Sequence, residues 1–216
     1  MKKRFPVSML LIMLLVFSLS PLSAQAYGTE QGARSCLQPK QVQLQQNLRK
    51  LWIDHAIWTR SYIVSALAGL MDQQDVLARL IQNQQDIGNA IKPYYGEEAG
   101  NKLAELLKEH ILIAGKVVDA AKSGNQADLK KHNEEWYRNA DDIAKFLSSA
   151  NPNWSEKELQ ELLYTHLQLL TDQVTARISK DWKADIIAFD KGEDHIIMLA
   201  DALAEGIVKQ FPEKFK

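Results

Sequence analysis

Three histidines, His55, His110 and His166, recur at intervals of 55 and 56 residues and could act as one chemical unit. Each follows leucines, or a tryptophan in the first copy, placed three, four and seven residues earlier. On a helix these positions share one face with the histidine, so each imidazole is expected to point into an apolar core. Neutral imidazole binds zinc, copper and iron. The three histidines could therefore hold a transition metal such as Zn, Cu or Fe if their helices meet.

A second set of polar residues repeats with the same step. Asn83 and Asp86 align with Asn139 and Asp142 at an offset of 56 residues, and the next step falls on His195. A buried imidazole needs hydrogen-bond partners, and these residues are the candidates. Both asparagines border the apolar face of their predicted helices. The two aspartates lie further round and reach a buried histidine only if those helices are covered on two sides.

Two interpretations of the repeated residues remain open. In the first, each buried neutral histidine forms a structural hydrogen bond with an asparagine or aspartate of a neighbouring helix. In the second, the residues form a metal site, because helical bundles bind metals through inward-facing histidines and carboxylates. The chain has no Glu-x-x-His pair and no His-Glu-x-x-His motif, which argues against di-iron and zincin sites. The predicted metal ligands are His55, His110, His166, His195, Asp86 and Asp142.

A small-ligand site is a further hypothesis. Trp58 and Arg60 lie off the main apolar face of the first predicted helix and could hold an anionic group through an aromatic ring and a fixed cation. Asn83 and Asn139 complete the predicted ligand-binding residues. No nucleophile elbow, phosphate-binding loop or dinucleotide fingerprint occurs in the sequence. These absences favour a binding or structural protein over an enzyme.

The elements that must position these residues are helices. Apolar residues follow the 3.6-residue period of amphipathic helices, and no strand pattern appears. The pattern predicts helices over 42–71, 72–93, 97–122, 128–148, 155–178, and from about 190 to 210. Segment 182–189 is expected to continue or kink the fifth of these. Short connections imply antiparallel neighbours. We therefore predict an all-α antiparallel bundle of six helices, built from three degenerate helix-hairpin repeats.

The N-terminal residues have the features of a secretory signal peptide. Met1-Lys2-Lys3-Arg4 is basic, residues 9–19 are apolar, and Ala24-Gln25-Ala26 is typical of a cleavage site. We predict a signal peptide over 1–26, a flexible arm over 27–40 and a single bundle domain over 41–216. The protein is accordingly expected to be secreted, with no transmembrane segment after cleavage.

Charge and cysteine content limit the partners. Without the three basic residues of the predicted signal peptide, 23 of the 26 basic residues remain against 27 acidic ones. Nucleic acid is therefore not an expected partner, since such binding requires a basic surface. The single cysteine, Cys36, cannot form an intramolecular disulfide and could at most link two chains.

Five short segments of the sequence are distinctive: 51–55 (LWIDH), 58–60 (WTR), 83–96 (NQQDIGNAIKPYYG), 150–154 (ANPNW) and 210–212 (QFP). Together they resemble a group of small secreted helical proteins from spore-forming Gram-positive bacteria. The resemblance covers nearly all of the chain beyond residue 26 and implies a shared fold rather than an activity. Some members carry the labels glycosyltransferase or acetylglutamate kinase, but those activities need an α/β nucleotide-binding sheet that this sequence does not predict.

The sequence predicts a secreted, non-enzymatic helical bundle that binds a metal ion or small ligand through its core histidines. The alternative is a structural or interaction module of the cell envelope, in which the histidines are purely architectural. The two hypotheses differ in whether the histidines converge. Ring nitrogens grouped within about 5 Å would support coordination, and isolated histidine–amide pairs would support the structural alternative.

Overall fold

The structure is a computed structural model that describes residues 39–216. This part contains five α-helices, α1 (Pro39–Ala68), α2 (Gln73–Ser123), α3 (Gln126–Ala150), α4 (Glu156–Ile178) and α5 (Trp182–Gln210), followed by the 3-10 helix η1 (Pro212–Phe215) and no strand. The all-α prediction is confirmed. The predicted signal peptide, Cys36 and all but the last two residues of the predicted arm lie outside the described residues. Pro39 and Lys40 already belong to α1.

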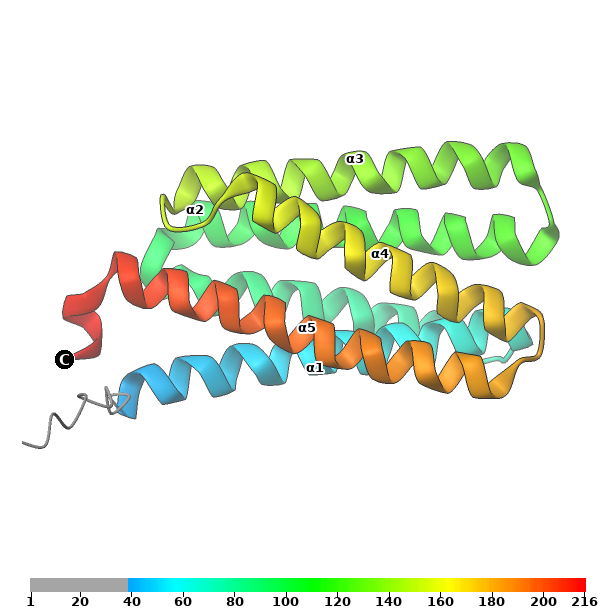
Figure 1. Ribbon diagram of the computed structural model, residues 1–216, viewed down its shortest axis with the longest axis horizontal. Helices are drawn as coiled ribbons and strands as arrows, with labels where there is room; N and C mark the ends of the chain where they lie inside the picture. Colours follow the sequence, from blue (N-terminus) through cyan, green and yellow to red (C-terminus); the bar gives the residue numbers. More distant parts are fainter. Residues whose placement is uncertain (1–38) are drawn as a thin grey trace, which may run out of the picture. The chain divides into compact units, whose positions relative to one another are not determined.

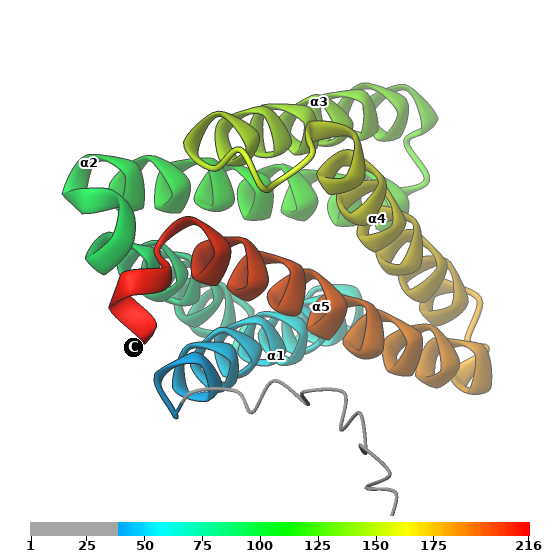
Figure 2. The ribbon, with the colours of Figure 1, turned by 60° about the vertical axis from the view of Figure 1, so that its left-hand side comes forward.

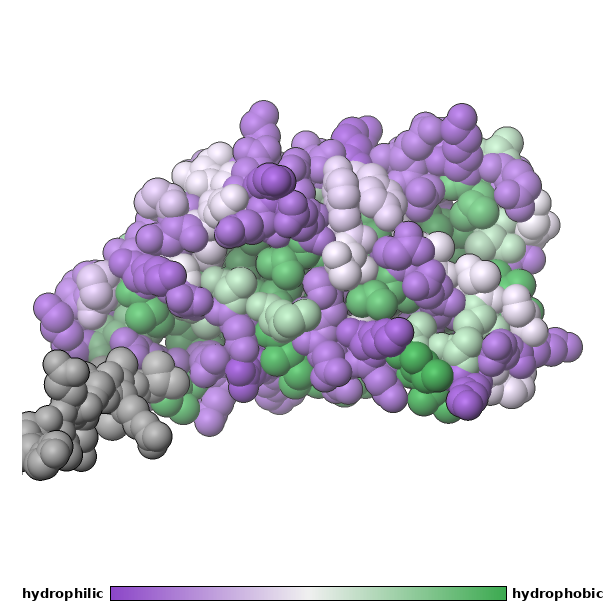
Figure 3. Space-filling view, viewed as in Figure 1, coloured by the Kyte–Doolittle hydropathy of each residue, from purple (hydrophilic) through white to green (hydrophobic). Residues whose placement is uncertain are grey.

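The helices form an antiparallel bundle (Figure 1). α1 packs against α2 and α5, α4 packs against α5 and α3, and α3 packs against α2. Leucine, isoleucine and alanine side chains from all five helices fill the core. Figure 3 shows one face of the bundle, where hydrophilic side chains predominate and apolar side chains appear between them. Within residues 39–216, no helix combines the length and apolar character needed to cross a membrane.

The bundle has five α-helices rather than six, because two predicted helices are joined in α2. The predicted turn at Tyr94-Tyr95-Gly96 is a sharp bend within this helix, where Gly96 has φ 84° and ψ 173°. Pro93, just before the bend, cannot donate a backbone hydrogen bond, and glycine readily adopts positive φ. The first half of α2 lies beside α1 and the second half beside α3 (Figure 2).

Two other predicted boundaries are wrong. α1 ends at Ala68 rather than at residue 71, since Gly69 adopts φ 66°. α5 begins at Trp182 rather than near residue 190, because the Asp181 side chain accepts a hydrogen bond from the Ala184 amide at 3.0 Å and caps the helix. Segment 182–189 is therefore the start of α5. The predicted start of a helix at residue 155 agrees with α4, where Ser155 is the N-cap and accepts from the amide of Glu158.

Candidate functional site

The structure brings three of the four predicted histidine ligands together. His55 on α1, His110 on α2 and His166 on α4 are all buried. The centroid of the His166 ring lies 5.6 Å from that of His55 and 6.3 Å from that of His110. We call these three residues the histidine layer. Trp52 and Trp136 flank it, with ring centroids 5.5 Å from His55 and 5.4 Å from His110.

Both ring nitrogens of His110 are hydrogen-bonded. The indole N–H of Trp136 donates to His110 Nε2 at 3.1 Å. Because an indole can only donate, Nε2 must be the unprotonated nitrogen, and Nδ1–H must donate to Asn139 Oδ1 at 2.8 Å. Burial lowers the pKa of His110 to about 4, which is consistent with a neutral ring. His110 therefore has no free nitrogen for a metal ion.

His195 lies on α5 and makes a different contact. Its Nε2–H donates to the backbone carbonyl of Leu162 at 2.7 Å. No ring contact joins it to the histidine layer in the part of the chain that the structure describes. The structure thus assigns His195 a hydrogen bond between α5 and α4, close enough to His166 to help lower the pKa of that ring but without a ring contact.

Three hydrogen bonds occupy equivalent places in the bundle. The side-chain amides of Asn83 and Asn139 donate to the carbonyls of Leu51 and Leu106 at 3.0 and 3.2 Å, and His195 donates to that of Leu162. Each accepting carbonyl belongs to the residue four positions before a histidine of the layer. Asn83 and Asn139 are fully buried by these contacts. Both predicted ligand-binding asparagines therefore have structural partners.

His166 and His55 retain unpartnered nitrogens. Neither Nδ1 nor Nε2 of His166 has a hydrogen-bond partner, and the same is true of His55 Nδ1 and of the indole N–H of Trp52. Burial lowers the pKa of His55 to about 3, and burial together with the neighbouring histidines lowers the pKa of His166 well below its usual value. Both rings are consequently neutral at pH 7. Unpaired buried polar atoms are rare in folded proteins and indicate a site for water, an ion or a ligand.

The predicted carboxylate ligands do not join the histidines. Asp86 accepts from Gln82 at 3.1 Å and lies 3.7 Å from the guanidinium of Arg79, at the edge of the solvent. Asp142 is exposed. Their helices are not covered on the side where these residues lie. Among residues 39–216, no group of three or more histidine, cysteine, aspartate or glutamate side chains is arranged to hold a metal ion.

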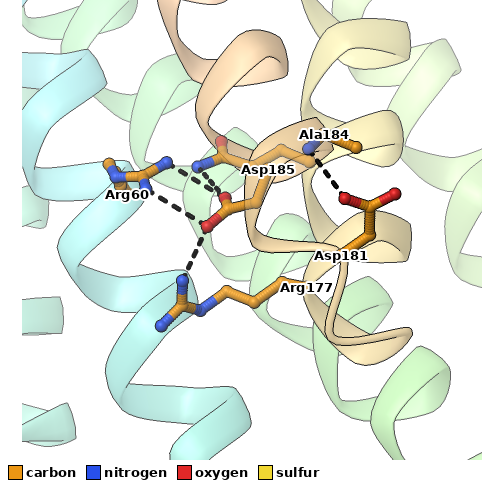
Figure 4. Close-up of polar contacts among 6 residues, drawn as sticks. Arg60, Arg177, Asp181, Ala184 and Asp185 are labelled. Atoms are coloured by element: carbon orange, nitrogen blue, oxygen red, sulfur yellow. Dashed lines mark hydrogen bonds and ion pairs between the residues drawn. The ribbon is translucent and has the colours of Figure 1, made fainter.

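Arg60, a predicted ligand-binding residue, is already paired. Its guanidinium donates to both oxygens of Asp185 at 3.0 and 3.2 Å, and Arg177 donates to the same carboxylate at 2.7 Å (Figure 4). Gln173 adds a contact at 3.3 Å. Asp185 is only 1% exposed, so two cations surround one buried carboxylate and join α1, α4 and α5. Arg60 is thus not free to hold an anionic ligand.

Trp58 is also engaged by a neighbouring residue. It is partly buried, and the guanidinium of Arg79 lies 5.3 Å from the centre of its ring. Each of the four predicted ligand-binding residues therefore has a partner within the bundle.

A cavity of about 90 Å³ lies one helical turn from the histidine layer. Thr59, Ala114 and Leu170 line it, and each stands four residues after one of the three histidines. The helix segments that carry these histidines run in the same direction along the bundle (Figure 1), so these residues all lie on the same side of the layer. α4 diverges from α3 towards this end (Figure 2). We call this space the wedge cavity.

The wedge cavity has apolar walls and an uncharged lining. No charged side chain borders it, and the exposed residues Thr171 and Thr175 of α4 lie at its mouth. Trp136 lines the cavity and donates to His110, so it connects the cavity with the histidine layer. The sequence contained only a weak signal of this space. Ala114 and Ala121 are small residues on the face that also carries His110, but their spacing does not show where neighbouring side chains leave a cavity.

The chain offers three features with functional potential: neutral buried histidines, unpartnered nitrogens and an adjoining apolar cavity. The resemblance to secreted proteins of spore-forming bacteria stays a prediction. Comparison with protein-family models, with curated proteins and with solved structures finds no match for this chain, so the function must be inferred from the chemistry of this site.

Proposed function

We propose that this protein is a secreted, non-enzymatic binding protein that holds a small, uncharged, largely apolar molecule in the wedge cavity. The observation that carries the proposal is the cavity itself, which lies one turn from the histidine layer and has no charged residue in its walls. Pockets for small molecules are typically concave and apolar, with a few polar groups that orient the ligand. The proposal that the protein acts outside the cell rests on the N-terminal sequence alone.

The size of the cavity supports a ligand rather than a single water molecule. A volume of about 90 Å³ has room for about three waters, at the roughly 30 Å³ that each occupies in the liquid. Waters beside apolar walls find few hydrogen-bond partners, and displacing poorly ordered water with an apolar group gains affinity. A substituted benzene would fill the space and extend towards the mouth at Thr171 and Thr175.

The histidine layer favours an uncharged ligand. Its rings are neutral at pH 7 because burial lowers the pKa of His55 to about 3 and that of His110 to about 4. A carboxylate or ammonium group in the cavity would lose its hydration without gaining an opposite charge. The layer therefore places no charge beside the cavity, to which it is connected through Trp136.

The experiment that tests this proposal is a titration with 4-fluorotoluene, followed by ¹⁹F NMR. The wild-type protein is expected to bind, and Ala114→Leu is expected to abolish binding because the larger side chain fills the cavity. Ala127→Leu, an exposed position on α3, is the matched control and should bind like the wild type. Equal binding by the Ala114 and Ala127 variants would contradict the proposal.

A second candidate function is metal binding, and the unpartnered nitrogens of His55 and His166 favour it. These two rings, with centroids 5.6 Å apart, would supply imidazole ligands, since His110 is committed to other partners. Elemental analysis of the protein without an affinity tag tests this candidate. Stoichiometric Zn, Cu or Fe that is lost in His166→Ala but kept in His132→Ala would support it, and no metal after reconstitution would exclude it.

The three equivalent hydrogen bonds also support the proposal that the chain consists of three degenerate hairpins. These are α1 with the first half of α2, the second half of α2 with α3, and α4 with α5. Each hairpin contributes one histidine to the layer from its first helix, and one side chain from its second helix donates to a carbonyl of the first. His195 takes the place that asparagine has in the other two hairpins.

A further inference from the structure

The hydroxyl of Thr59 is a buried polar group without a partner. Thr59 is 6% exposed and lines the wedge cavity, and its Oγ1 makes no hydrogen bond. Two other helical threonines, Thr165 and Thr171, bond to the carbonyl four residues earlier at 2.8 and 2.9 Å. An unpaired buried hydroxyl destabilises the fold, so a ligand group that pairs with it gains affinity.

Thr59 stands at the polar end of the cavity. It lies one helical turn from His55, at the end of the cavity that is nearest to the histidine layer. Residues one or two turns further from the layer, Val118, Ala121 and Val174, are apolar. At the mouth, the hydroxyl of Thr171 is already bonded to the carbonyl of Leu167. A ligand would therefore meet the free hydroxyl of Thr59 at one end and mainly apolar side chains, together with the ring of Tyr62, along its length.

We infer that the wedge cavity selects an uncharged molecule with an apolar body and a single hydroxyl group, a phenol or small alcohol, and that Thr59 recognises this hydroxyl. The inference rests on the binding function proposed above and adds the chemical class of the ligand. A threonine hydroxyl can both donate and accept, so it can pair with a ligand hydroxyl in either direction.

The test compares 4-fluorophenol with 4-fluorotoluene, which differ only in a hydroxyl and a methyl group of similar size. Dissociation constants are measured by ¹⁹F NMR for the wild type and for Thr59→Val, which keeps the shape of the side chain but removes its hydroxyl. In the wild type the hydroxyl of Thr59 should favour fluorophenol. The ratio of the dissociation constant of fluorotoluene to that of fluorophenol is therefore expected to fall about five- to tenfold in Thr59→Val, which is the effect of losing one net hydrogen bond. Thr165→Val, at an exposed position of α4 that does not line the cavity, should leave the ratio unchanged.

The outcomes separate this inference from the proposed function. Binding of both compounds with the same ratio in the wild type and in Thr59→Val would overturn the role of Thr59 and leave the cavity as a binding site. No binding of either compound by the wild type would overturn both. Thr59→Ser retains the hydroxyl and is expected to keep the wild-type ratio. A ratio in Thr59→Ser as low as in Thr59→Val would also overturn the inference.

Discussion

At the scale of the residue, the histidine layer contains rings in two different states. His110 accepts from Trp136 and donates to Asn139, so both of its nitrogens contribute to the fold. His166 lies beside it with both nitrogens unpaired. Removing a group that pairs with buried partners leaves those partners unsatisfied, whereas removing an unpaired group does not. Substitutions of these two neighbouring histidines should therefore have different consequences.

We expect His110→Ala to lower the free energy of unfolding by about 3 kcal/mol, since it leaves the Trp136 indole and the Asn139 carbonyl unpaired and creates a cavity. His132→Ala, on a partly exposed histidine of α3 that pairs with Glu135, is the control and should change it by about 1 kcal/mol or less. Urea denaturation measures both. Similar effects of the two substitutions would show that the His110 hydrogen bonds do not stabilise the bundle.

The buried histidines also predict how stability depends on pH. Burial lowers the pKa of His55 to about 3 and that of His110 to about 4, while an unfolded chain binds protons near pH 6.5. The free energy of unfolding is therefore highest above pH 6.5, where the histidines are neutral in both states. It decreases as the pH falls from 6.5 towards the folded-state pKa values, because only the unfolded chain takes up the protons. Each such histidine lowers the free energy of unfolding by about 1.4 kcal/mol per pH unit in that range.

Urea denaturation at pH 7, 6 and 5 tests this dependence. His166→Leu removes a ring whose pKa is also lowered and whose nitrogens are unpaired, so it should flatten the pH dependence with little loss of stability at pH 7. Stability that is unchanged between pH 7 and pH 5 in the wild type would contradict neutral buried histidines.

At the scale of the element, the bend of α2 depends on glycines for two different reasons. Gly96 provides the backbone angles, with φ 84° and ψ 173°, in open space. Gly88 and Gly100 provide close approach, because a Cβ on either one would collide with the backbone carbonyl of the other. The two halves of α2 can therefore cross beside the bend only if both positions lack a side chain.

We expect Gly88→Ala and Gly96→Ala each to lower the free energy of unfolding by about 1–3 kcal/mol, the first through steric overlap and the second through backbone strain. Gly192→Ala, inside α5 with open space around its Cβ, is the matched control and should raise stability by about 0.5–1 kcal/mol. Thermal unfolding measures all three. A stabilised Gly88→Ala would contradict the close approach.

At the scale of the described bundle, Asp185 connects three helices through one buried carboxylate. Arg60 comes from α1 and Arg177 from α4, and Asp185 itself lies in the first turn of α5. Arg49 and Asp201 form a more exposed pair between α1 and α5, with side chains 42% and 33% exposed. Exposed pairs contribute little to stability, whereas breaking a buried pair leaves uncompensated charge.

Asp185→Ala is accordingly expected to lower the free energy of unfolding by about 3–5 kcal/mol, because two partly buried guanidinium groups lose their counterion. Asp201→Ala, the control, should cost about 1 kcal/mol or less. Chemical denaturation at low and at high salt measures the loss of stability in both variants. High salt should reduce only the loss caused by Asp201→Ala, because that pair is exposed to solvent. Equal costs would show that the Asp185 cluster does not hold the helices together.

Helical periodicity acts within a few residues, so the amino-acid pattern alone predicted the helical class, the inward direction of the three histidines and the start of a helix at residue 155. It also placed the break near Gly96, although it did not show that one helix bends there. Only the tertiary structure decided that His110 pairs with Trp136 and Asn139, that Asp185 binds Arg60, and that a cavity remains beside Thr59. These features depend on the rotation and offset of helices packed against one another, and local spacing along the chain does not encode either one.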